Sequence, residues 1–351
     1  MNTITSSKKV VRDSNMELLR IVAMLLVMIV HANFRALPVP TYEEANHEIM
    51  SSILRFFTES FSIICVNVFI LLSGWYGIKL KIERLLEFVF QVLFFSIIGL
   101  IIIQFISPEK YTLTNCIGNI LLTDKWDYWF VKAYLGLYLF SPILNSFIEY
   151  ATKKQYQIVL IAFYVFHTVY GWAFPEGAIY FERGYSAMSF MGLYLLARYI
   201  RLYPFSLCRK SYRFDLFIYL FITVLITLIQ FFFKRTDIPY GGYFIFYSCP
   251  LVIISAVFFM LIFTKIHLKS RFVNWVACSC FAVYLLHSNG FLAKPYYDNI
   301  ILNWFNELST IPFLMHVIPF ILFVFIAAIL LDKIRLAIWK VITIKFHLNK
   351  I

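Results

Sequence analysis

Charged residues are scarce in this sequence. Only 14% of its 351 residues are Asp, Glu, Lys or Arg, against about 25% in an average soluble domain, whereas 61% are hydrophobic and 20% are aromatic. This composition excludes a disordered chain and an ordinary soluble enzyme. A membrane-spanning helix needs about 20 apolar residues, so ten spans would use roughly 200 residues and leave only short loops. We therefore expect an all-α integral membrane protein, with residues 1–351 forming a single domain.

Motifs typical of metal, nucleotide and hydrolase sites are also missing. The six cysteines lack the paired spacing of a zinc site, and there is neither a glycine-rich phosphate loop nor a Gly-x-Ser-x-Gly nucleophile motif. We expect the cysteines to be packing residues and expect no metal and no permanently bound cofactor. No internal repeat is visible, which weakens the alternative of a transporter built from duplicated halves.

Uncharged apolar stretches, bounded by charges, proline or glycine, predict ten membrane spans. The predicted spans are residues 17–34, 56–78, 85–106, 128–148, 155–173, 185–201, 214–233, 242–264, 273–293 and 312–331. The sixth span is short, because its uncharged part runs only from Gly184 to Ala197. Arg198 and Arg201 would have to extend along the helix to reach the membrane surface.

The distribution of basic residues predicts the orientation. With the N-terminus inside, the ten spans place 21 Lys and Arg residues in cytoplasmic segments and 8 in outer segments. Such a bias towards the cytoplasm is typical of membrane proteins. We therefore expect both termini to be cytoplasmic, and we interpret the net charge of +12 as a topology signal rather than as a nucleic-acid-binding surface.

The first span contains the most informative pair of residues. Arg20 is followed by ten uncharged residues and then by His31. Eleven steps of about 100° make roughly three turns, so the two side chains share one helix face about 16 Å apart along the axis. Glu17 precedes Arg20 by three positions and is close enough to pair with it. In a purely structural interpretation, Arg20 extends to the inner surface and His31 bonds to a neighbouring helix.

Ionisable groups within the membrane are costly and are candidates for function by default. In the functional interpretation, His31 takes a proton from a hydroxyl nucleophile or carries an acyl group transiently. An acyl-CoA thioester matches the polarity of this helix face. Its phosphates would bind on the basic cytoplasmic side, while its pantetheine arm would run from Arg20 towards His31.

Four motifs, in order along the chain, resemble the acyltransferase family 3 membrane proteins. They are Asn15-x-Glu-Leu-Leu-Arg20 with His31, Val68-Phe-Ile-Leu-Leu-Ser-Gly-Trp-Tyr76, the segment YWFVKAYLGLYLFSPILN over residues 128–145, and Tyr284-Leu-Leu-His287. The resemblance implies a ten-helix acyltransferase in which Arg20 and His31 are the functional pair. Many relatives O-acetylate bacterial surface polysaccharides with cytoplasmic acetyl-CoA, so the expected location is the bacterial inner (plasma) membrane, crossed many times.

Two basic clusters on the predicted cytoplasmic side are candidates for binding the phosphates of coenzyme A. Lys79, Lys81 and Arg84 lie where relatives often carry an arginine cluster. Ordinary positive-inside charges are the alternative explanation. The five cationic residues within 198–213 could serve the same purpose, and the sequence does not decide between the two loops.

Candidates for binding the acceptor lie at the fourth and ninth predicted spans. Trp126, Tyr128 and Trp129 form either an aromatic belt at the outer interface or, together with Asp127, whose carboxylate can bind hydroxyls, a mouth that binds sugar. Lys132 lies one turn further into the fourth span and either extends to the interface or donates to substrate. His287 is expected at a depth similar to that of His31, where it orients the acceptor or the acyl carbonyl, or else packs as a structural residue.

These observations predict a transferase that moves an acetyl or other short acyl group from cytoplasmic acyl-CoA to a hydroxyl of a sugar or surface polysaccharide. The expected partners are acyl-CoA as co-substrate, a glycan acceptor and the lipid bilayer, without nucleic acid, and the formation of a homodimer is left open. The alternative is a transporter or flippase for a glycan or lipid-linked sugar. Duplicated halves with paired broken helices would indicate that alternative, and the sequence shows neither.

Overall fold

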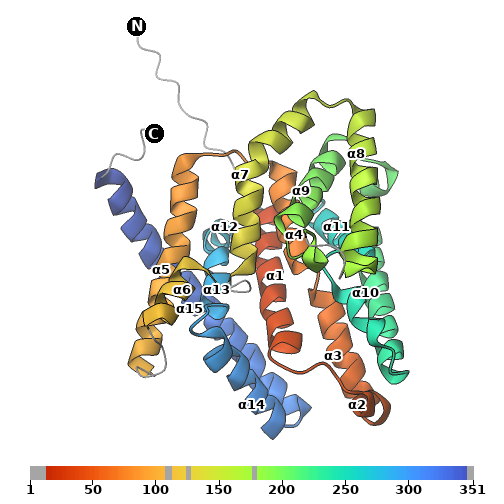
Figure 1. The fold of residues 1–351 in the computed structure, drawn as a ribbon, viewed down its shortest axis with the longest axis vertical. Coiled ribbons are helices and arrows are strands. Elements are labelled where there is room, and N and C mark those ends of the chain that lie inside the picture. The colour runs from red at the N-terminus through yellow and green to blue at the C-terminus, as the bar shows by residue number, and fades with distance from the viewer. Residues whose placement is uncertain (1–12, 107–112, 124–127, 176–179, 346–351) are drawn as a thin grey trace.

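The computed structural model describes residues 13–106, 113–123, 128–175 and 180–345, and every regular element within these ranges is a helix (Figure 1). The α-helices are α1 (Ser14–Val30), α2 (Tyr42–His47), α3 (Ile49–Ser62), α4 (Cys65–Tyr76), α5 (Ile82–Ile106), α6 (Leu113–Leu121), α7 (Trp129–Tyr150), α8 (Lys153–Phe166), α9 (Ala187–Leu202), α10 (Tyr212–Arg235), α11 (Pro250–Thr264), α12 (Arg271–Ala277), α13 (Cys280–His287), α14 (Asn299–Glu307) and α15 (Thr310–Lys345). Wider π-helical turns form η1 (His31–Arg35), η3 (His167–Ala173) and η8 (Ala293–Asp298), and tighter 3-10 turns form η5 (Glu182–Gly184), η6 (Ser206–Arg209) and η7 (Pro239–Ile245).

Eight helical segments in the described part of the chain are long and apolar enough to cross a membrane. They are Ser14–Arg35, Ile49–Tyr76, Ile82–Ile106, Trp129–Tyr150, Lys153–Ala173, Tyr212–Arg235, Pro239–Thr264 and Thr310–Lys345. The chain is therefore an all-α, multi-pass membrane protein. The other two predicted spans coincide with α9, which has 16 residues, and with the pair α12 and α13. Ten spans stay a prediction.

Two of the predicted spans, 56–78 and 273–293, are each broken by a two-residue turn, although the sequence shows no sign of broken helices. The turn at Ile63 and Ile64 separates α3 from α4, and the turn at Cys278 and Ser279 separates α12 from α13. Residues 273–293 are therefore not one continuous helix, and α13 ends at His287. Neither break contains proline or glycine, which are the usual local signals of an interruption.

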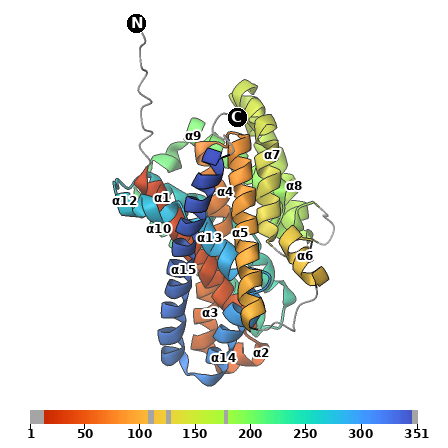
Figure 2. The ribbon, with the colours of Figure 1, turned by 90° about the vertical axis from the view of Figure 1, so that its left-hand side faces the viewer.

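The centre of the bundle is formed by the segments Ile49–Tyr76 and Pro239–Thr264, whereas α7 and α8 lie towards the outside (Figures 1 and 2). In their most apolar stretches 72% and 67% of the residues are buried, against 22% for the α7 and α8 segments. Gly74 of α4 permits close contact with α9, since a Cβ at this position would lie 2.6 Å from the carbonyl oxygen of Tyr194. Small residues commonly mediate such close helix packing in membranes.

The described ends of the chain lie on one side of the bundle. Helix α1 begins, and α15 ends, towards the top of Figures 1 and 2, as an even number of spans requires. At 1.5 Å per residue the 36 residues of α15 extend about 54 Å, well beyond the roughly 30 Å of membrane hydrocarbon. In its last third Arg335 is buried between Asp332 of the same helix and Glu87 of α5. That the termini are cytoplasmic stays a prediction.

Candidate functional site

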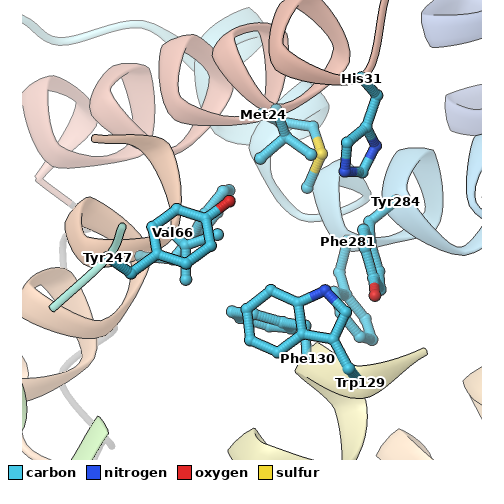
Figure 3. Close-up of a pocket in the computed structure, with 10 residues that line it drawn as sticks. Met24, His31, Val66, Trp129, Phe130, Tyr247, Phe281 and Tyr284 are labelled. Carbon is cyan, nitrogen blue, oxygen red and sulfur yellow. The ribbon is translucent and has the colours of Figure 1, made fainter. Parts of the chain in front are cut away.

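A small cavity lies between α1, α4, α7 and α13, with about 390 Å³ of empty space including its open mouth (Figure 3). Its walls are mainly apolar and aromatic, and they are formed by Met24, Val27, His31, Val66, Phe69, Trp129, Phe130, Tyr247, Phe281 and Tyr284. Met24 and Val27 of α1 and His31, the first residue of η1, recur at intervals of three and four, which places them on one helix face. Arg20 precedes Met24 by four positions and belongs to the same face. The cavity therefore lies along the predicted stripe between Arg20 and His31.

Arg20 is at the N-terminal end of this stripe. It forms an ion pair with Glu17, which confirms the predicted pairing within the first turns of α1. Its side chain keeps 34% of its accessible surface. The hydroxyl of Tyr134, on α7, interacts electrostatically with both Arg20 and Arg84. Arg20 and Arg84, which is one of the three basic residues predicted to bind the donor, therefore both lie within electrostatic range of Tyr134.

His31 contacts His287, which lies 256 positions later in the chain. The two imidazoles are joined through Nδ1 of His31 and Nε2 of His287 at 2.8 Å, and their ring centroids are 5.0 Å apart. His287 is only 2% exposed, whereas His31 is half-buried and forms part of the cavity wall. A substrate in the cavity can therefore contact His31, with His287 behind it.

The contacts of His287 determine where protons can lie. Its Nδ1 is 2.5 Å from the carbonyl oxygen of Val283, which can only accept, so Nδ1 carries hydrogen and Nε2 is an acceptor in the neutral ring. Nε2 in turn faces Nδ1 of His31. Two lone pairs cannot form a bond, so a proton must lie between the two rings. When that proton belongs to Nδ1 of neutral His31, Nε2 of His31 is free to accept a proton from a substrate.

Arg35 competes for the same nitrogen of His31. Its Nη1 lies 2.8 Å from Nδ1 of His31 and 3.0 Å from Oγ of Ser288. An arginine only donates, so a bond from Arg35 to Nδ1 would force the hydrogen of neutral His31 onto Nε2. Asp298 restrains Arg35 by accepting from Nη2 at 2.8 Å and from Nε at 3.1 Å. The orientation of Arg35 therefore influences which nitrogen of His31 is available.

Arg35 and Asp298 were not among the candidates that the sequence suggested. The only local signal is that Arg35 follows His31 by four positions, one helical turn later. Asp298 has no signal of its own, because its partner lies 263 positions away. Burial raises the pKa of Asp298, an effect that the neighbouring Arg35 and Lys294 partly offset.

Both residues of this ion pair are carried by π-helical turns. In η1 the N–H of Ala36 donates to the carbonyl of His31, five positions earlier, instead of the four of an α-helix. In η8 the N–H of Tyr297 similarly donates to the carbonyl of Leu292. Such wide turns change the direction of the following side chains and are frequent at functional sites. Here they bring Arg35 and Asp298 together beside His31.

The remaining predicted residues are distributed around the molecule. Trp129 forms part of the cavity wall, with its ring 5.8 Å from that of Tyr247, so it lies inside the bundle and not in a belt facing lipid. Lys132 donates to the carbonyl of Leu122 at 3.4 Å. Lys79, Lys81 and Arg84 are exposed at the turn between α4 and α5. Trp126 and Asp127 lie outside the described residues.

The arrangement can support proton transfer next to a small apolar cavity. One half-buried imidazole borders the cavity, a second imidazole binds its far nitrogen, and an ion pair lies beside both. Within the described ranges, no group of His, Cys, Asp and Glu residues could hold a metal ion. A general base needs this geometry, in which one nitrogen is held by the protein and the other is accessible to the reacting group.

The fold and the site define an integral membrane protein with a histidine at a cavity inside its helical bundle. The sequence profile of acyltransferase family 3, described as "Acyltransferase domain", matches residues 13–333, and the chain belongs to this family. It is therefore a membrane acyltransferase. No curated protein and no solved structure matches the chain.

Proposed function

We propose that this protein transfers an acetyl or other short acyl group from cytoplasmic acyl-CoA to a hydroxyl of a sugar or surface polysaccharide at the outer face of a bacterial inner membrane. The observation that carries the proposal is the position of His31, which borders the cavity while its Nδ1 faces His287. A base supported in this way matches the needs of acyl transfer to a hydroxyl. The small cavity favours a short acyl group.

His31 carries the proton in the proposed reaction, and His287 supports His31. The acceptor oxygen attacks the thioester carbonyl and forms the new C–O bond, while Nε2 of His31 takes the hydroxyl proton. His287 stabilises the resulting imidazolium through its bond to Nδ1, as the orienting group does in a hydrolase triad. When the tetrahedral intermediate collapses, the C–S bond breaks and the coenzyme A thiolate receives the proton from His31.

The donor would approach from the end of α1 that carries Arg20. Arg20 and Arg84 both interact electrostatically with the hydroxyl of Tyr134. Lys79 and Lys81 are exposed after the end of α4. Positive charges at this opening suit the phosphates of coenzyme A. Its flexible arm would then run along Met24 and Val27 to the cavity. The acceptor would approach from the opposite end, near Arg35 and Asp298.

The decisive experiment mixes purified protein in vesicles with radiolabelled acetyl-CoA and candidate glycans. Transfer of label to glycan supports the proposal, and movement of unmodified glycan across the membrane without label transfer would indicate the transporter alternative. Omitting the acceptor distinguishes the two roles of His31. Label that stays on the protein and requires His31 indicates a transient acyl carrier, whereas an unlabelled protein indicates a general base.

The donor site is tested by replacing Lys79, Lys81 and Arg84 together with Ala. We expect the apparent KM for acyl-CoA to rise more than kcat falls, and the effect of added salt to shrink, because exposed charges are screened within about 8 Å at physiological ionic strength. A control variant replaces Lys153 and Lys154 at the start of α8 with Ala. An unchanged apparent KM for acyl-CoA in the triple variant would contradict this site. The basic residues within 198–213 would then be the alternative donor site.

A further inference from the structure

A second, larger space of about 950 Å³ lies between α1, α3, α14 and α15, and we call it the α3–α15 groove. It is lined by Ile29, Ala32, Asn33, Leu37, Ser51, Leu54, Arg55, Thr58, Phe305, Leu308, Thr310, Phe313, Leu314, Val317, Ile318 and Ile321. His31 lies on the wall of the other cavity. The outward-running end of α1 therefore separates the groove from the proposed reaction site, and neither space depends on the residues of the other.

The groove is open to the apolar surface of the bundle. Three of its lining residues, Leu54, Leu314 and Ile318, are 44%, 39% and 54% exposed. On α15 the neighbouring Ile311 and Met315 are exposed as well, which marks this face of the helix as facing lipid. The α15 stripe from Thr310 to Ile321 is about 16 Å long at 1.5 Å per residue. A long apolar groove that opens to lipid suits a hydrocarbon chain.

Polar side chains gather at one end of the groove around Arg55. The Arg55 side chain is buried, and its guanidinium lies 4.9 Å from the ring centre of Phe305. Nη2 donates to the carbonyl of Pro38, and Nη1 is 3.7 Å from a carboxylate oxygen of Glu44. Nε has no hydrogen-bond partner in the structure. A buried N–H of a charged group is costly when unpaired, so an acceptor oxygen from a ligand is expected here.

The charges near Arg55 restrict the kind of head group. Both Glu44 and Glu48 interact electrostatically with Arg55, so negative charge is abundant around this single cation. A head group with only negative charge would gain one contact with Arg55 and be repelled by the two glutamates. A zwitterionic head group with an ammonium beside its phosphate would complement both signs. The ammonium would face Glu44 and Glu48, and a phosphate oxygen would accept from Nε of Arg55.

We propose that the α3–α15 groove binds a zwitterionic phospholipid of the phosphatidylethanolamine type. One acyl chain lies along the α15 stripe from Phe313 to Ile321, and the phosphate binds Arg55 at the polar end. The wall formed by α1 is held in place because Asn33 donates to the carbonyl of Arg55 and to Glu59, each at 3.0 Å. The site is separate from the acyl-transfer reaction and does not rest on the proposed function.

The test uses the full-length protein, purified in detergent, depleted of lipid and reloaded with phosphatidylethanolamine or phosphatidylglycerol of identical chains. Native mass spectrometry measures the bound fraction. We expect a preference for phosphatidylethanolamine, and we expect Arg55→Leu to weaken its binding roughly tenfold or more, as loss of a hydrogen bond to a charged group implies. Lys234→Leu, which removes a charge at the outer end of α10, is the matched control and should bind as the wild type does.

A second variant keeps the proposal testable if Arg55→Leu does not fold. Thr58→Trp narrows the groove one helical turn from Arg55 without changing charge and should also reduce binding, whereas Ile161→Trp on the exposed face of α8 should not. Equal or stronger binding of phosphatidylglycerol would overturn the assignment of the head group. Undiminished binding of phosphatidylethanolamine in a folded Arg55→Leu or Thr58→Trp variant would overturn the site itself.

Discussion

Two histidines in this protein are equally buried but have different surroundings. His287 and His167 are each 2% exposed; His287 is the last residue of α13, and His167 directly follows α8. Nε2 of His167 is 3.0 Å from the hydroxyl of Ser189, and its ring stacks on Phe163 at 5.4 Å. Nε2 of His287 instead faces His31, which borders a cavity. Burial and residue type are therefore the same for the two histidines, and what differs is the chemistry of the partner.

The largest effect is expected from His31, through which His287 would act. His31→Ala should lower the rate of acyl transfer by about 10²–10⁴, the usual cost of losing a general base. Activity is measured with labelled donor and normalised to protein that elutes as a single species in detergent. His316→Ala, an exposed histidine on α15, is the control and should keep wild-type activity. Wild-type transfer by well-folded His31→Ala would show that the proposed mechanism is wrong.

The helix face that carries Arg20 and His31 could be predicted from the sequence because it depends only on the period of the α-helix. The pairing of Arg20 with Glu17 is local for the same reason. The contact between His31 and His287 could not be derived, since it joins residues 256 positions apart and depends on how α1 and α13 pack. Similar depth in the membrane was predictable for the two histidines, but contact was not.

The turns that interrupt the regular helices could not be predicted from the sequence either. The turn at Ile63 and Ile64 is made by two apolar β-branched residues, and the π-helical turn at His31 contains neither proline nor glycine. Such turns are stabilised by the surrounding packing rather than by local propensity. The direction of the Arg35 side chain depends on η1. The ion pair between Arg35 and Asp298 therefore could not be predicted from the sequence.

The next largest effect is expected at His287. His287→Leu removes the acceptor 2.8 Å from Nδ1 of His31, so Arg35 can donate there unopposed and hold the hydrogen of His31 on Nε2. We expect at least a tenfold loss of kcat, since the group that orients a catalytic histidine contributes up to about 10⁴ in a protease triad. The acid limb of the pH–rate profile should move as well, because the partner of the base has changed.

His287→Gln provides the conservative comparison. Its side-chain amide can still place an oxygen acceptor near Nδ1 of His31, so it should recover part of the lost rate. A residue that only packs would give equal activity per folded molecule in the Leu and Gln variants, with a wild-type pH profile. That result would show that His287, like His167, has only a structural role.

A smaller effect is expected at Asp298, which acts on His31 only through Arg35. Asp298→Asn weakens the restraint on Arg35 and should lower kcat by roughly tenfold or less, the order of a single hydrogen bond to a charged group. Asp298→Glu keeps the charge and should recover part of the activity. Glu307→Gln removes an exposed carboxylate from α14 and is the control. If Asn and Glu at position 298 behave alike, the charge of Asp298 has no role in the reaction.

The smallest effect on activity is expected at His167. His167→Leu removes the bond to Ser189 and leaves that buried hydroxyl with one partner fewer, which should cost about 1–3 kcal/mol of stability. Thermal unfolding should therefore begin at a lower temperature, and less folded protein should be recovered from membranes. Transfer per folded molecule and the pH–rate profile should stay as in the wild type, because His167 does not line the cavity. Ser189→Ala should reproduce the same loss of stability. A change in the pH–rate profile of His167→Leu would contradict the distinction between the two histidines, because it would show that a histidine bonded to a serine hydroxyl also takes part in the proton transfer.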